Sequence, residues 1–141
     1  MKTQMAVTVR NDVAALERLN TFLSEFWDEN RLPQELAMDV TLALEEVFLN
    51  VVQHGYLDVA EHEILVRLAL ERGNVALTVE DDGVPFNPLD SPPPDTNLPV
   101  EQREIGGLGI HLVQRVMDGI EYAREGQHNR LVMRKRIAEA G

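Results

Sequence analysis

Residues 42–56 read LALEEVFLNVVQHGY, and they combine the apolar spacing of a buried helix with polar side chains one turn apart. The spacing predicts a helix over residues 35–53. In such a helix Glu46, Asn50 and His54 recur every four residues and form a polar stripe along one side. Gly55 then ends the helix, where we expect a left-handed backbone conformation. A polar stripe beside a buried face predicts a functional site on this helix.

The helical phase separates the two adjacent glutamates. Each residue of a helix turns by about 100° around its axis. With Val47 of the buried stripe at zero, the angular positions are about −100° for Glu46, about −60° for Asn50 and about 160° for Glu45. Glu45 therefore points to solvent, whereas Glu46 borders the packed face. The geometry makes Glu46 the candidate for chemistry.

The remaining patterns predict a mainly antiparallel sheet covered on one face by three helices, which is an α+β, two-layer sandwich. Alternation predicts strands at 5–9, 63–70, 75–80, 120–123 and 130–134, and apolar spacing predicts helices over 13–29 and from 106 to about 117. The length of 141 residues fits one domain, 1–141. Prolines at 91–99 predict an extended loop rather than a linker between domains, because the residues after them hold too little for a second core.

Composition limits the class of partner. Thirteen Lys and Arg against 24 Asp and Glu leave a net charge of −11, which argues against direct binding of nucleic acid or of an anionic membrane. We interpret the basic residues Arg130, Arg134 and Arg136 as the solvated face of a strand. The absence of cysteine excludes disulfides and thiolate metal sites, and no leader or membrane-spanning run is evident, so we expect a soluble, cytoplasmic protein.

Three separated stretches supply what transfer of phosphate from ATP to a protein requires. Asn50 offers a neutral oxygen ligand for Mg²⁺, and Glu46 offers a base one turn away. Asp81, at the end of a strand, can accept a hydrogen bond from the exocyclic amine of adenine, and Gly83 permits close approach of the backbone. The glycines of 106–109 expose N–H groups at a helix start, where anions bind.

In these motifs the sequence resembles the GHKL-type (Bergerat-type) ATPase superfamily, and most closely the bacterial anti-sigma-factor serine/threonine-protein kinases, over nearly the whole chain. Residues 46–54 are similar to the N box of that family. Residues 81–86, DDGVPF, are similar to its D-x-G-x-P/G box, and residues 106–110, GGLGI, to its second glycine box.

The resemblance implies a histidine kinase-like ATPase fold, ATP and Mg²⁺ as cofactors, Glu46 as the general base, Asn50 as the metal ligand and Asp81 as the adenine contact. It implies a nucleotide site that consists of Asn50, Asp81, Gly83, Pro85, Gly106, Gly107, Leu108 and Gly109, with residues 87–106 as the ATP lid. Two positions depart from the family pattern. Pro85 stands where many relatives have glycine, and Ile105 replaces the first glycine of the fuller glycine box.

By resemblance, we expect a Mg-ATP-dependent serine/threonine kinase and anti-sigma regulator that phosphorylates an antagonist protein in a partner-switching circuit, with a sigma factor as a second partner. The alternative is a non-catalytic, ATP-binding interaction module that sequesters a sigma factor or another regulator. A histidine kinase is disfavoured, because no dimerising hairpin precedes the first strand. Relatives often form homodimers, and no feature of the sequence decides whether this chain does.

Overall fold

The computed structural model describes residues 3–56, 60–85, 87, 89 and 107–137, and within them five strands form one antiparallel sheet. The order across the sheet is β1-β2-β3-β5-β4. The strands are β1 (Gln4–Arg10), β2 (Glu63–Glu71), β3 (Asn74–Asp81), β4 (Gly119–Glu125) and β5 (His128–Arg136). β2–β3 and β4–β5 are antiparallel hairpins, β1 pairs with β2 although a 3₁₀ turn and the first two α-helices separate them in the chain, and β5 lies between β3 and β4.

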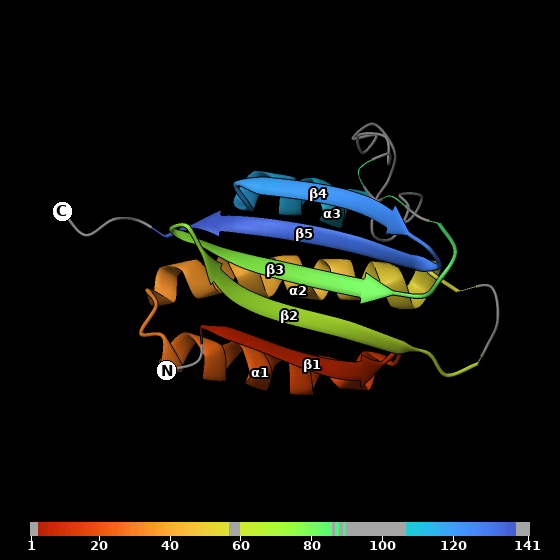
Figure 1. Cartoon of the computed structure of the whole chain (residues 1–141), viewed down its shortest axis with the longest axis horizontal. Helices are drawn as coiled ribbons and strands as arrows, with labels where there is room; N and C mark the ends of the chain where they lie inside the picture. The colour runs from red at the N-terminus through yellow and green to blue at the C-terminus, as the bar shows by residue number, and fades with distance from the viewer. Residues whose placement is uncertain (1–2, 57–59, 86, 88, 90–106, 138–141) are drawn as a thin grey trace.

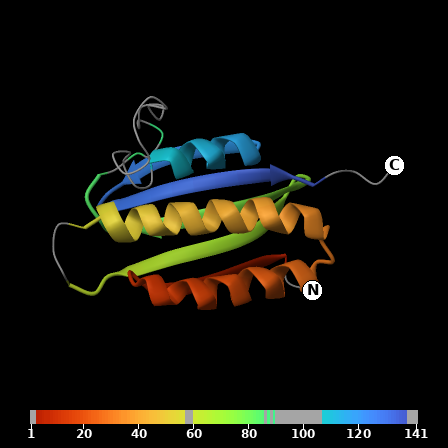
Figure 2. The same ribbon diagram turned by 180° about the vertical axis from the view of Figure 1, so that it is seen from behind.

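Three α-helices within the described residues cover one face of this sheet and leave the other face open (Figures 1 and 2). They are α1 (Leu16–Glu29), α2 (Gln34–His54) and α3 (Gly107–Val116). A single 3₁₀ turn, η1 (Val13–Ala15), precedes α1, and the side chain of Asp12 accepts a hydrogen bond from the backbone N–H of Ala14 at 3.0 Å. The predicted α+β fold is confirmed.

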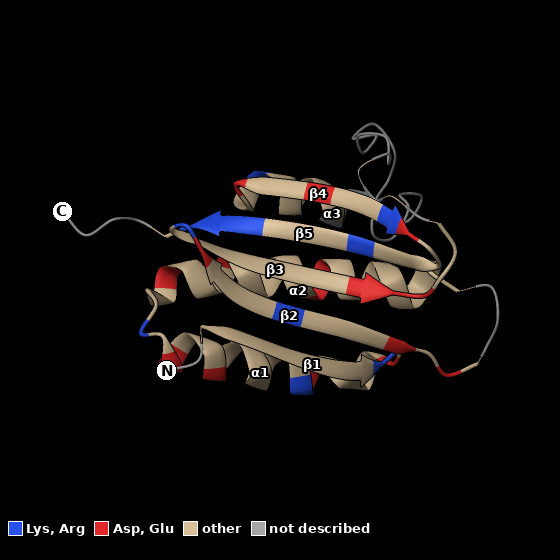
Figure 3. Cartoon of the chain, viewed as in Figure 1, with Lys and Arg blue, Asp and Glu red and all other residues tan. Residues whose placement is uncertain are grey.

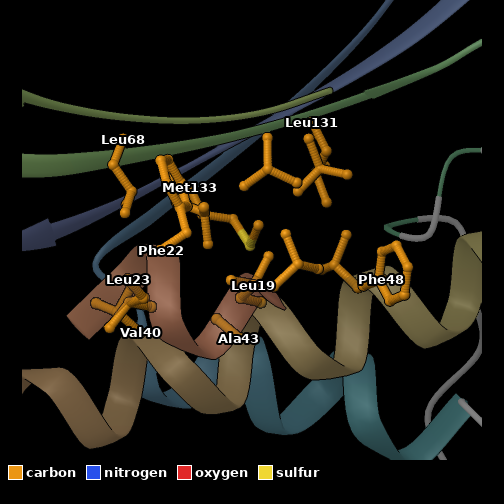
Figure 4. Packing of buried hydrophobic residues seen from close by; sticks show 14 of the residues in the cluster. Leu19, Phe22, Leu23, Val40, Ala43, Phe48, Leu68, Leu131 and Met133 are labelled. Carbon is orange, nitrogen blue, oxygen red and sulfur yellow. The ribbon is translucent and has the colours of Figure 1, made fainter. Parts of the chain in front are cut away.

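The core lies between the helices and the sheet, where the predicted apolar stripes meet (Figure 4). From the helices come Leu19, Leu23, Phe26, Val40, Leu44, Val47, Ile110 and Val113, and from the strands come Ile64, Val66, Leu68, Leu77, Leu131 and Met133, all buried. Trp27 is 1% exposed, and its Nε1 donates a hydrogen bond to the carbonyl oxygen of Pro33 at 2.8 Å. This bond ties the end of α1 to the start of α2.

The open face of the sheet carries charged residues in cross-strand pairs (Figure 3). Arg130 contacts Glu80 of β3 at 2.7 Å and Glu125 of β4 at 2.9 Å, and Arg134 contacts Glu121 of β4 at 3.0 Å. The interpretation of these arginines as a solvated strand face is therefore confirmed, because the register of β5 pairs them with carboxylates of its neighbours.

The structure bears on the predictions for Gly55 and for the ATP lid. Gly55 does follow α2, but its φ of −79° is right-handed, so the predicted left-handed conformation is wrong. Glycine is needed there for space, because a Cβ would lie 2.6 Å from the carbonyl oxygen of Val51. The predicted ATP lid, 87–106, falls outside the described residues except at positions 87 and 89.

No helix among the described residues is long and apolar enough to span a membrane.

Candidate functional site

The candidate site lies where three elements end. The C-terminal ends of α2 and β3 and the N-terminal end of α3 lie at the same end of the molecule (Figures 1 and 2). A pocket opens there between α2 and the sheet. It is lined by Val47, Asn50, Val51 and Gly55 from the helix side, and by Val79, Asp81, Tyr122, Asn129 and Leu131 from the sheet. Mostly apolar walls with a few polar groups are typical of a ligand site.

Asp81 is the acidic group of this pocket and is only 5% exposed. Burial raises the pKa of Asp81 above its ordinary value of 3.8, while hydrogen bonds from Asn129 and from the backbone of Gly83 act in the opposite direction. The N–H of Gly83 donates to Oδ1 of Asp81 at 2.8 Å, and Nδ2 of Asn129 donates to the same oxygen at 3.0 Å. The structure thus holds a carboxyl group in an apolar pocket with one oxygen already bonded.

Gly83 brings the loop after β3 against the end of α2. A Cβ at this position would lie 2.1 Å from the carbonyl oxygen of Gly55 and 2.9 Å from Oδ1 of Asp81. The N–H of Val84 donates to the carbonyl oxygen of Gly55 at 2.8 Å, and Nη1 of Arg124 donates to the carbonyl oxygen of Gly83 at 2.8 Å. Gly83 therefore allows a close backbone approach to the end of α2, while its predicted approach to a ligand stays a prediction.

Asn50, the predicted metal ligand, lies on the wall of this pocket. Its residue is 6% exposed, and its side chain makes no hydrogen bond among the described residues. A buried amide that needs partners and faces a pocket fits a role in binding a ligand or a metal through its oxygen. Among the described residues, no group of three or more histidine or acidic side chains is arranged to hold a metal ion. The side-chain oxygen of Asn50 is of the type that Mg²⁺ accepts as a ligand.

Glu46 lies one turn before Asn50 on α2 but does not line the pocket. Both Glu46 and its neighbour Glu45 are half-buried, so burial does not separate the two glutamates as the helical phase does. The choice of Glu46 over Glu45 stays a prediction. His54, the last residue of the predicted stripe, is exposed and does not line the pocket.

The glycine box is described in part. Gly107, Leu108 and Gly109 form the first turn of α3, and the N–H groups of a first turn have no partner within their own helix and can bind anions. Gly106 lies outside the described residues. Pro85 is exposed, beyond the hydrogen-bonded turn at Val84.

Several residues of the site were not predicted, chiefly Asn129, Tyr122 and Arg124. Asn129 is 5% exposed and bonds to Asp81, Val84 and Tyr122. The sequence offered one signal. Asn129 lies on the same face of its strand as the inward-facing Leu131 and Met133, so it is a polar residue at a core position. Nothing in the sequence indicates its partner, 48 residues away.

Residues 9–135 match the model of the histidine kinase-like ATPase domain, and the chain belongs to that family. This confirms the predicted membership of the GHKL-type ATPases. "Serine-protein kinase RsbW" of Bacillus mycoides (strain KBAB4) is 40% identical over 88 residues, which are 59% of this chain and 54% of that protein. The RsbW of Bacillus cereus (strain AH187) is 31% identical over 125 residues, 85% of this chain and 76% of that protein.

The matched region spans about half the length of the first of these relatives. Among solved structures, that of the RsbU and RsbW domains of Rv1364c from Mycobacterium tuberculosis has a TM-score of 0.70 at 19% identity. The alignment covers 99% of this chain and 34% of that one. It shows that the two share a fold.

Proposed function

We propose that this chain is a Mg-ATP-dependent serine/threonine kinase and anti-sigma regulator that phosphorylates an antagonist protein. The observation that carries the proposal is the pocket that buried Asn50 and buried Asp81 line together with apolar residues, in a chain of the histidine kinase-like ATPase family. Relatives that match over most of this chain are named serine-protein kinase RsbW, which supports the kinase and anti-sigma roles. As the cellular setting we propose the cytoplasm, with residues 1–141 acting as one domain.

Each predicted site residue has a proposed part. Asp81 accepts a hydrogen bond from the amino group of adenine, and the first turn of α3, with Gly106 before it, donates N–H groups to the phosphates. Asn50 holds Mg²⁺, which neutralises phosphate charge when bound. Glu46 takes the proton of the substrate hydroxyl as that oxygen attacks phosphorus. Gly83 and Pro85 shape the loop beside the adenine.

The partner is proposed from the family relatives. We propose an antagonist protein that carries the acceptor serine or threonine, and a sigma factor that the chain sequesters when the antagonist is phosphorylated. The acidic net charge of −11 makes direct contact with nucleic acid unfavourable, so regulation of transcription would act through these proteins.

Transfer of labelled phosphate from ATP to candidate antagonist proteins tests this proposal. Glu46→Gln keeps the size of the side chain and removes the base, so ATP binding should persist while transfer falls by at least about 100-fold. Glu45→Gln is the matched control on the same helix turn and should retain transfer. If Glu45→Gln abolishes transfer and Glu46→Gln does not, the assignment of the base is wrong. ATP binding with no transfer to any antagonist would favour the non-catalytic alternative.

A further inference from the structure

Asn129 occupies the centre of a hydrogen-bond network in the sheet wall of the pocket. It faces Asp81 directly in the register of β5 and β3. Its Nδ2 donates to Oδ1 of Asp81 at 3.0 Å and to the carbonyl oxygen of Val84 at 2.8 Å, and the hydroxyl of Tyr122 donates to its Oδ1. Asn129 and Asp81 are each 5% exposed, so water competes little for these bonds.

The network permits only one orientation of the Asn129 amide. Both hydrogens on Nδ2 point at acceptors, the carboxylate of Asp81 and the backbone carbonyl of Val84. If the amide were reversed, its oxygen would face these two acceptors, which is unfavourable. Both N–H donors of Asn129 are therefore bonded within the protein, and neither can bind a ligand.

Asp81 is oriented by the same bonds. The two hydrogen bonds that it accepts, from Gly83 and from Asn129, both end on Oδ1. Oδ2 has no hydrogen-bond partner among the described residues, and Asp81 lines the pocket. An ionised carboxylate only accepts hydrogen bonds, so Oδ2 favours an N–H group on a ligand and repels a carbonyl oxygen.

We infer that Asn129 is a positioning residue that makes the pocket selective for a purine with an amino group at C6, because it holds Oδ1 of Asp81 and leaves Oδ2 to accept the base N–H. A 6-oxopurine presents an oxygen at the same position and is rejected. This inference rests on the proposed function, since it concerns the base of the nucleotide that the kinase would use.

The donors on Oδ1 also favour the ionised form of Asp81, because they lower its pKa. Burial raises the pKa of Asp81 and neighbouring Asp82 adds to the rise, whereas Asn129, the N–H of Gly83 and Arg124 lower it. Loss of the Asn129 donors should raise the pKa of Asp81 further. A protonated Asp81 can donate a hydrogen bond to a 6-oxo group, so selectivity should then fall as the pH is lowered.

The test compares the affinities of ATP and of inosine triphosphate, whose base carries a 6-oxo group. For the unmodified chain, we expect ATP to bind about 10- to 100-fold more tightly, the range for one hydrogen bond to a charged group. Asn129→Leu removes both donors, and we expect it to reduce this ratio to about 3-fold or less, with inosine triphosphate binding better at pH 6 than at pH 8. Tyr122→Phe keeps both Asn129 donors and should reduce the ratio less than Asn129→Leu.

Asn129→Thr keeps one hydroxyl donor and a smaller side chain, and it decides the question if Asn129→Leu does not fold. We expect an intermediate ratio, and a raised pKa of the Asp81 carboxyl by ¹³C NMR in the nucleotide-free protein. An unchanged ratio and an unchanged Asp81 pKa in a variant that still binds ATP would overturn the inference. Failure of the unmodified chain to bind ATP would instead reject the proposed function, while the NMR measurement would still decide whether Asn129 controls Asp81.

Discussion

Gly83→Ala tests whether the contact between the loop after β3 and the end of α2 builds the pocket. The added Cβ would lie 2.1 Å from the carbonyl oxygen of Gly55, whereas ordinary contact begins at 3.4 Å, so the two backbones must separate by 1.3 Å. Both are backbone segments, and neither can rotate away as a side chain can. The separation also breaks the bond from the N–H of Val84 to Gly55, which is 2.8 Å long.

We expect the free energy of unfolding to fall by about 1.5–4.5 kcal/mol, from overpacking at about 1–3 kcal/mol and one lost hydrogen bond at about 0.5–1.5 kcal/mol. For a chain of this size, the midpoint of thermal unfolding should fall by about 5–15 °C. ATP affinity should fall at least about tenfold as well, because the bond from Gly83 to Asp81 is displaced.

Urea unfolding, followed by the fluorescence of the single tryptophan, Trp27, measures the stability change. Gly119→Ala is the matched control, since a Cβ at that position would meet only the Cβ of Arg134 at 3.9 Å. We expect this control to change stability by less than about 0.5 kcal/mol. Equal stability and equal ATP affinity of the two variants would refute the close-approach argument.

Three further predictions concern the walls and support of the site. Asn50→Ala should reduce Mg-dependent ATP affinity at least about tenfold in titration calorimetry while lowering stability by less than about 1 kcal/mol, because the amide has no intramolecular hydrogen bond to lose among the described residues. Asp81→Asn should abolish preference for ATP yet leave stability at pH 7 unchanged or higher. The pKa of Asp81 in the folded chain is raised above 3.8, so protonation of Asp81 stabilises the fold. This stabilisation is complete below pH 3.8 and is lost as the pH rises through the raised pKa. The free energy of unfolding, measured as a function of pH, should show this dependence in the unmodified chain and not in Asp81→Asn. Trp27→Phe should lower stability by about 1–3 kcal/mol, through the lost bond to Pro33 and a small cavity, and should leave ATP affinity unchanged.

Much of the fold follows from local pattern. Apolar residues at steps of three and four predict helices over 13–29 and 35–53, and the structure has them at 16–29 and 34–54; alternation in 63–70 and 75–80 predicts the first hairpin. These signals are strong because one buried face of a helix or strand repeats at a fixed period. The turn of that hairpin lies at Arg72 and Gly73, which both have positive φ values.

The residues of the candidate site were predicted only in part. Asn50, Asp81 and Gly83 were predicted from their residue types, their positions on a helix and after a strand, and the resemblance to family motifs, and the structure places all three near one end of the sheet. The assignment of Glu46 over Glu45 came from helical phase alone, and both side chains are half-buried in the folded chain. That assignment still depends on the kinase assay.

By itself the sequence determined the elements, their buried faces and the motif residues that point to ATP, because these depend on residues within one or two turns of each other. Only the tertiary structure decided what surrounds Asp81. Asn129 reaches that carboxyl because β5 pairs with β3 in one particular register, and Gly83 must be glycine because the end of α2 arrives against it. Such contacts join residues about 28 to 48 positions apart along the chain, and no local period specifies them.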